Sequence, residues 1–378
     1  MYDEGAVIMA DVLLVLHGAE HRARRLLELK VFRRDFFRYY EHQVFPETLR
    51  QTMRPFVERG SADLMDLGYR VTMNLTADFA GIDRPDRTSE ETARLLALVM
   101  TFSEGATLVH STRDKDAVRA EVRLAMRRFD EQFYQPSLAR RRALVDACQR
   151  GAVPADSLPR DVLTVLVANE DRIELPPEVM MREIAFYLQA GSHSTANATV
   201  HAFHDLTVWR QSHPEDGARM DRDPLFLQRC VHESLRLHPA SPVAWRKPVC
   251  PMHLPTGQEV GDADRVVIDL AQANCDPDVF GDDAQVFNPH RRLPDGVPPW
   301  GLTFGVGVHT CLGRDLDGGV LPRADTDPQT HQYGIVPLFV QSLFEQGARL
   351  DPERKAVPAS HTERPNWGAY PIVFGDRS

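Results

Sequence analysis

A long stretch without proline is the feature that most constrains this fold. Pro176 and Pro177 open it, and it continues to Pro214 through EVMMREIAFYLQAGSHSTANATVHAFHDLTVWRQ. Proline in the first helical turn is a helix start signal. A helix of this length would reach roughly 50 Å at about 1.5 Å per residue, enough to cross a whole domain. We therefore expect one spanning helix here.

The middle of this helix is unusual, because residues 191–197 are small and polar where a buried helix should be apolar. Such side chains compete for backbone hydrogen bonds and invite a local kink. An irregular turn inside a spanning helix often marks a ligand site. The segment is therefore predicted to face a ligand.

The remaining chain reads as a mainly α (α+β) fold. Residues 20–40 form an amphipathic basic helix or helix pair, although a solvated arginine face fits them as well, and residues 90–150 also look helical. Short β-like runs such as 266–268 follow Pro239, and residues 274–313 read mostly as a loop. A loop this long inside a compact domain is usually functional. No linker is evident, so residues 1–378 are predicted to form a single domain.

Composition excludes several classes of function. The net charge is -10, and no basic run with interleaved aromatic residues appears, so nucleic-acid binding is not expected. The five cysteines form no CxxC pair, which disfavours a zinc site or a disulfide framework and favours a reducing, cytoplasmic location. The apolar run 6–16 contains Asp11 and is too short to span a bilayer, so no membrane anchor is expected.

The strongest chemical signal is residues 304–313, FGVGVHTCLG. Glycines let the backbone adopt unusual dihedrals and approach a flat ligand. Backbone N–H groups around the Cys311 sulfur would stabilise a thiolate over a thiol. A thiolate on haem iron pushes electron density onto the metal and favours O–O cleavage.

This string resembles the haem-binding loop of the cytochrome P450 family, FGxGxHxCxG, at every fixed position. The resemblance implies the fold of that family and a haem b whose iron is held by Cys311. It also implies that His309 contacts a haem propionate. Phe304, Gly305 and Gly313 are the further cofactor-binding residues that it implies in this loop.

A second motif is ExxR. Glu233 and Arg236 lie three residues apart and can pair on one helical face. In front of the cysteine loop they resemble the family's core ion pair, which an arginine of the next segment completes. Phe287-Asn288-Pro289-His290-Arg291 resembles that segment, so Arg291 is the expected third partner. These residues are predicted to be structural.

Three more basic residues match family positions. Arg246 resembles an arginine that pairs with a haem propionate, for which the two parallel hydrogen bonds of a guanidinium are well suited. His21 and Arg25 resemble the HxxxR of the helix that covers the other propionate. Their spacing puts them on one helical face, although a solvated face would show the same pattern.

The spanning helix departs from the family pattern A-G-x-(D/E)-T-T. Gly191 keeps its place near the cofactor, but His193 replaces the acid and Ser194 replaces the threonine, with Thr195 next to it. The family's acid and alcohol relay protons during oxygen activation. A histidine can shuttle protons and a serine can donate and accept, so the relay is either altered or lost. Alternatively, His193 faces a polar group of the substrate.

Two further segments depart from the pattern of the cytochrome P450 family. Family members carry a helix, sheet strands and a lid before the HxxxR helix, whereas His21 lies almost at the start here; either more sequence precedes it or the fold lacks these parts. Residues 317–336 interrupt the helix that normally follows the cysteine, and the helix is expected to resume at Leu338. This insertion is expected near the surface where electron donors dock.

The resemblance implies a monooxygenase that inserts one oxygen atom from O2 into a small hydrophobic substrate. Electrons would come from NAD(P)H through a separate ferredoxin and ferredoxin reductase. Two alternatives stay open: a haem-thiolate enzyme that uses peroxide or performs a non-oxygenating reaction, and a haem protein that binds a ligand without turnover. The candidate substrate contacts, which core packing would explain equally well, are Phe186, Gln189, Val243 and Ala244.

Overall fold

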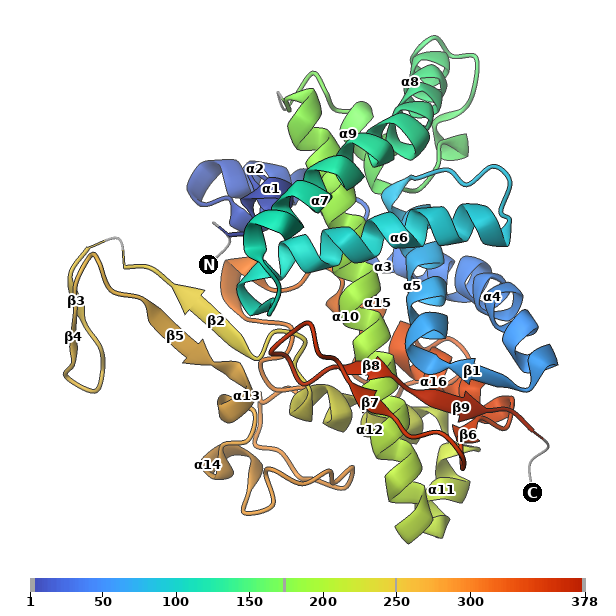
Figure 1. Cartoon of the computed structure of the whole chain (residues 1–378), viewed down its shortest axis with the longest axis vertical. Coiled ribbons are helices and arrows are strands. Elements are labelled where there is room, and N and C mark those ends of the chain that lie inside the picture. Colours follow the sequence, from blue (N-terminus) through green and yellow to red (C-terminus); the bar gives the residue numbers. More distant parts are fainter. Residues whose placement is uncertain (1–3, 173–174, 249, 376–378) are drawn as a thin grey trace. The chain divides into compact units, whose positions relative to one another are not determined.

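The computed structural model describes residues 4–172, 175–248 and 250–375 (Figure 1). The chain divides into two compact units, residues 201–311 and residues 4–200 with 312–375. Each unit is described by itself. The boundary between residues 200 and 201 falls within one long helix, α10 (Pro177–Ser212). The single domain expected over residues 1–378 stays a prediction.

The larger unit is mostly helical. Its α3 and α4 are joined by a π-helical turn, as are α7 and α8, so each pair forms one continuous helical run. The prediction for residues 90–150 is confirmed except for a short break before α7. The helices of this unit besides α10 are α1 (Ala6–Met9), α2 (Gly18–Glu28), α3 (Arg34–Tyr39), α4 (Phe45–Arg59), α5 (Leu64–Ala80), α6 (Ser89–Ala106), α7 (Lys115–Phe129), α8 (Gln135–Gln149), α9 (Val162–Val167), α15 (Arg314–Asp317) and α16 (Ile335–Glu345).

A small sheet joins distant parts of this unit. β1 pairs antiparallel with β9, with Ser61 opposite Val373, and β9 pairs with β6. A separate two-stranded ribbon is formed by β7 and β8. The strands are β1 (Ser61–Asp63), β6 (Arg349–Leu350), β7 (Val357–Pro358), β8 (Trp367–Ala369) and β9 (Pro371–Val373).

The smaller unit consists of short helices, a hairpin and a long loop. β2 pairs with β5, with Ala244 opposite Ile268. β3 pairs with β4 in the segment that connects β2 to β5 (Figure 1). The strand predicted at 266–268 and the loop-rich character of 274–313 are confirmed. The elements are α11 (Pro214–Met220), α12 (Pro224–Leu237), α13 (Leu270–Ala273), α14 (Pro277–Phe280), β2 (Val243–Arg246), β3 (Met252–His253), β4 (Glu259–Val260) and β5 (Val266–Asp269).

The long helix α10 is confirmed, and it runs without interruption through residues 191–197. Its small polar side chains bond to carbonyls one turn back instead of breaking the helix. Ser192 Oγ donates to Leu188 O at 2.6 Å, and Asn197 Nδ2 donates to His193 O at 2.8 Å. Local back-bonding of this kind satisfies the hydroxyl or amide while the backbone ladder persists.

Close packing of α5 on α10 explains two glycines. A Cβ on Gly68 would lie 3.5 Å from Ala196 Cβ, and a Cβ on Gly191 would lie 2.9 Å from Thr76 Oγ1. The backbones therefore approach more closely than larger side chains would permit. Residues buried along α10 include Ile184, Leu188, Ala196 and Val200.

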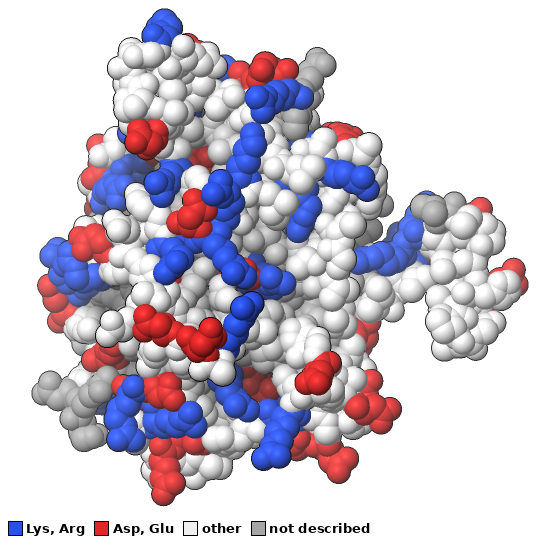
Figure 2. Space-filling view, turned by 180° about the vertical axis from the view of Figure 1, so that it is seen from behind, with Lys and Arg blue, Asp and Glu red and all other residues white. Residues whose placement is uncertain are grey.

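Surface charge is mixed. On the face in Figure 2, Lys and Arg side chains lie among Asp and Glu side chains. Within the described ranges, no helix combines the length and the apolar composition that crossing a membrane requires.

Candidate functional site

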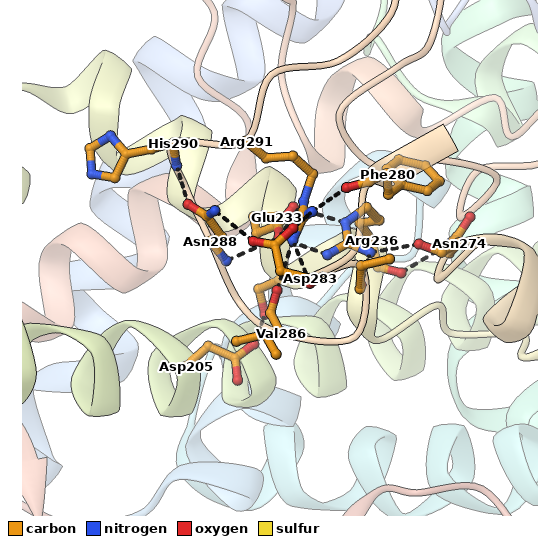
Figure 3. A network of polar contacts seen from close by, with 12 residues as sticks. Asp205, Glu233, Arg236, Asn274, Phe280, Asp283, Val286, Asn288, His290 and Arg291 are labelled. Atoms are coloured by element: carbon orange, nitrogen blue, oxygen red, sulfur yellow. Dashed lines mark hydrogen bonds and ion pairs between the residues drawn. The ribbon is translucent and has the colours of Figure 1, made fainter. Parts of the chain in front are cut away.

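The ExxR residues form a buried network in the smaller unit (Figure 3). Glu233 Oε1 accepts hydrogen bonds from Arg236 Nη2 at 2.7 Å and from Arg291 Nε at 3.1 Å. Its Oε2 accepts from Arg236 Nε at 2.8 Å. Arg236 also donates to the carbonyls of Asn274 and Ala284. The network thus ties α12 to the irregular segment before the cysteine loop, a structural role.

The Cys311 loop is anchored by its aromatic residues. Phe304 is buried and packs edge-to-face on Trp300, with ring centroids 5.6 Å apart. Gly305 and Gly307 have left-handed φ values of 65° and 76°, which glycine adopts without steric cost. The Cys311 N–H donates to Phe304 O at 2.8 Å, which closes the loop and leaves the cysteine exposed.

The predicted propionate contacts fall in both units. In the smaller unit, His309 ends the 3-10 turn Gly307–His309, and the exposed Arg246 donates from Nη1 to Trp245 O at 2.8 Å. In the larger unit, His21 and Arg25 lie one turn apart on α2. His21 is buried. Burial, and then the positive charge of Arg25, lower the pKa of its imidazole. Gly313 precedes α15. Their roles as haem contacts stay predictions.

His193 faces α5. Its Nδ1 lies 2.7 Å from Tyr69 Oη, and Asn197 Nδ2 donates to the same hydroxyl at 3.4 Å. Burial, and then the positive charges of Arg364 and His361, lower the pKa of His193 to about 3. Burial raises the pKa of Tyr69 to about 12. Near neutral pH the pair is therefore a neutral imidazole beside a neutral phenol.

A cavity of about 240 Å³ lies beside this pair in the larger unit. Its lining is mixed: Leu96 and Met100 contribute apolar side chains, and Asp66 is among the polar residues that line it together with Tyr69 and His193. His193 thus borders a cavity on the α5 side of α10.

Ser194 and Thr195 have different partners. Ser194 Oγ donates to Ala190 O at 2.5 Å, whereas Thr195 Oγ1 donates to Asp317 Oδ1 at 2.7 Å. Asp317 is the last residue of α15, and burial raises its pKa to about 6. A Cβ on Gly191 would meet Thr76 of α5. The contact of Gly191 with the cofactor stays a prediction.

The predicted substrate contacts divide between the units. On α10, Phe186 is half-buried and Gln189 is buried. Val243 and Ala244 are half-buried on β2 and pair with Asp269 and Ile268. Their contact with a substrate stays a prediction.

A buried ionic cluster between α2 and α10 was missed by sequence reasoning. Arg24 pairs with Glu183, and Tyr187 donates to Glu28. The Leu13 N–H donates to both carboxylate oxygens of Glu183. Burial raises the pKa of Glu183 to about 7 and that of Glu28 well above its usual range, with repulsion from Glu183 the next cause for Glu28. In α10, the position of Glu183 next to the buried apolar residues Ile184 and Ala185 is the signal that marks this cluster.

The insertion after α15 folds back on the unit. Val320 N donates to Gln332 O at 3.0 Å, and Gln332 Nε2 donates to Asp315 O at 2.6 Å. The helix resumes at Ile335, earlier than the predicted Leu338, because Gly334 takes a φ of 92° and ends the insertion there. Buried Glu41 accepts from the Gly334 N–H at 3.0 Å and so fixes that turn.

Comparison with known families matches residues 125–316, about half of the chain, to the family described as Cytochrome P450. The cytochrome P450 monooxygenase PikC from Streptomyces venezuelae is 28% identical over 259 residues, which cover 68% of this chain and 53% of PikC. The chain thus spans about half the length of PikC in this match.

Two solved structures share the fold. The crystal structure of CalO2 superposes with a TM-score of 0.73 at 20% identity, covering 98% of this chain and 82% of CalO2. CYP154A1 from Streptomyces coelicolor A3(2) gives a TM-score of 0.68 at 21% identity, with 98% and 82% covered. The fold and the cysteine loop define a mainly helical protein of the haem-thiolate class. The chain belongs to the cytochrome P450 family.

The donor set fits the haem that this family binds. A thiolate is the soft ligand that such iron takes, and Cys311 is exposed at the end of a loop shaped by two left-handed glycines. Within the smaller unit, Arg246 carries a guanidinium group of the kind that pairs with carboxylates. Cys311 would thus hold the iron, and Arg246 would hold a propionate.

Proposed function

We propose that the protein is a monooxygenase that inserts one oxygen atom from O2 into a small hydrophobic organic substrate. The observation that carries this proposal is the exposed Cys311 at the end of a glycine-shaped loop in a chain of the cytochrome P450 family. Haem bound through a thiolate supplies the oxygen chemistry. Phe186, Gln189, Val243 and Ala244 are the proposed substrate contacts, and the cytoplasm is the proposed location.

The residues of the chain position and protect this chemistry. The Phe304–Trp300 contact anchors the loop that carries the sulfur. The Glu233 network holds the segment in front of that loop. On α10, Ser194 keeps its hydroxyl bonded to Ala190 O, so it can hold or pass a proton at Oγ.

The proposed electron source is NAD(P)H through a ferredoxin and its reductase. Val306 and Val308 beside Cys311 are exposed by 69% and 71%. Exposed apolar side chains next to one another support a contact surface for a partner protein. These valines are the residues of the loop that we assign to donor docking.

A second candidate function is oxidation with peroxide in place of O2 and electrons. It is supported by His193, whose imidazole is neutral near pH 7 and bonds to Tyr69. An altered proton supply would hinder O2 activation but would leave a peroxide-driven reaction less affected, because peroxide brings its own protons.

The decisive experiment is an absorption spectrum of the purified protein, reduced and with carbon monoxide. The strongly red-shifted Soret band of thiolate-bound haem is expected, and Cys311→Ala should abolish it. Turnover with NAD(P)H, ferredoxin and reductase is then compared with turnover on hydrogen peroxide. Absence of the band would refute the haem-thiolate assignment, and turnover on peroxide alone would favour the second candidate.

A further inference from the structure

Asp317 is a half-buried carboxyl group in contact with the unusual part of α10. Its Oδ1 accepts the hydroxyl hydrogen of Thr195 at 2.7 Å. Thr195 is only 5% exposed and follows Ser194 directly in the chain. An acid and an alcohol therefore meet at this turn of α10, although the acid comes from the segment after the cysteine loop.

The insertion encloses this pair. Gly318 and Gly319, both buried, end α15 immediately after Asp317, and the chain returns at Gly334. A Cβ on Gly334 would lie 2.6 Å from Asp317 O, so the returning segment packs directly against the aspartate backbone. The Val320–Gln332 hydrogen bond of 3.0 Å closes the loop between these points. The inserted segment thus covers part of Asp317 and leaves its carboxyl group half-buried.

His193 is a poor source of protons by comparison. A group whose pKa is about 3 carries no exchangeable imidazolium proton near neutral pH. Its Nδ1 is also directed at Tyr69 on α5, whereas the Thr195 hydroxyl is directed at α15. The position that the sequence motif assigns to the acid is therefore filled by a neutral ring.

We propose that Asp317 supplies protons for the oxygen chemistry through Thr195, in place of residue 193. This inference rests on the proposed monooxygenase function. Asp317 is a positioning residue, since it acts through the threonine. The carboxyl gives its proton to Thr195 Oγ1, the threonine passes its own hydroxyl proton to a water molecule in the site, and solvent reprotonates the carboxylate. The net result is one proton delivered from solvent to that water molecule, and no electron is transferred.

The titration of Asp317 supports this role. Burial raises its pKa to about 6, and the hydrogen bond from Thr195 opposes that shift. Among the described residues, no charged neighbour contributes to the shift. An acid whose pKa lies near the working pH is suited to proton transfer.

The first test follows the carboxyl group itself in the full-length, haem-loaded protein. Because Glu41 and Glu183 also have raised pKa values, of about 6 and about 7, the infrared spectrum of Asp317→Asn is subtracted from that of the wild type. The difference spectrum should show a protonated carboxyl C=O band that titrates near pH 6. Asp315→Asn is the matched control on the same helix, because that carboxylate pairs with Arg314 at 2.8 Å. Thr195→Val should raise the midpoint, since the lost hydrogen bond stabilises the carboxylate.

The second test measures product formed per NAD(P)H consumed, as a function of pH. Asp317→Asn and Thr195→Val should lower this yield by about 100-fold, a typical effect of losing general acid–base assistance. Asp317→Glu should restore part of it, and the Asp315→Asn control should not reproduce the loss.

Three results would overturn the inference. They are a wild-type yield in Asp317→Asn, a larger loss in His193→Gln than in Asp317→Asn, or a difference spectrum between wild type and Asp317→Asn without a carboxyl band that titrates near pH 6. A wild-type protein with the thiolate carbon monoxide band but without any NAD(P)H-driven product would instead refute the proposed function. The two failures are therefore distinguishable.

Discussion

Replacing Glu233 by glutamine tests whether its charge holds the smaller unit together. Arg236 is fully buried and Arg291 is 8% exposed, and both donate to the Glu233 carboxylate. An arginine cannot release its proton. The substitution would therefore leave the buried Arg236 without a counter-ion and Arg291 with Asp283 alone. It would also place an amide against existing N–H donors.

The expected loss in the free energy of unfolding follows from that geometry. Removing one partner of a buried ion pair typically costs about 3–5 kcal/mol, which is a large part of the roughly 5–15 kcal/mol that stabilises a domain. Asp283→Asn is the control, because Asp283 contacts the same Arg291 at 2.5 Å but its side chain is 47% exposed. An exposed pair contributes about 0–1 kcal/mol.

Urea unfolding of the haem-loaded variants at neutral pH, followed by circular dichroism, measures both values. The free energy of unfolding should fall several-fold more in Glu233→Gln than in Asp283→Asn. Equal losses in the two variants would refute the reasoning, because burial of the pair would then make no difference to its contribution.

Two further perturbations concern the larger unit. Burial, and then repulsion from the Glu183 carboxylate, raise the pKa of Glu28 in the folded protein. The stabilisation from protonated Glu28 is therefore fully present below the usual carboxyl pKa. It is lost as the pH rises through the raised pKa of the folded protein. Glu28→Gln should therefore make the free energy of unfolding fall less between about pH 5 and about pH 9 than in the wild type; an unchanged slope would contradict this. Gly334→Ala should lower the melting temperature more than Gly60→Ala. Both glycines have a positive φ, but only a Cβ added at Gly334 would meet Gly319 N, at 2.3 Å. Equal losses in the two variants would exclude a steric cause.

Local patterns in the sequence were sufficient for several features. The length of α10 follows from the proline-free run, because helix formation depends on neighbouring residues. The turn before Cys311 follows from its glycines, two of which take positive φ. The pairing of Glu233 with Arg236 follows from their spacing on one helical face.

Contacts between distant segments were decided only by the tertiary structure. Thr195 and Asp317 are 122 positions apart, and Arg24 and Glu183 are 159 apart. No periodicity of the sequence relates such residues, because their meeting depends on how helices pack and how the insertion folds back. The same packing turns His193 toward Tyr69 and fills the space at Gly191 with Thr76. The sequence by itself therefore determined the helix and the sulfur loop, whereas burial in the folded chain decided which side chains hold protons.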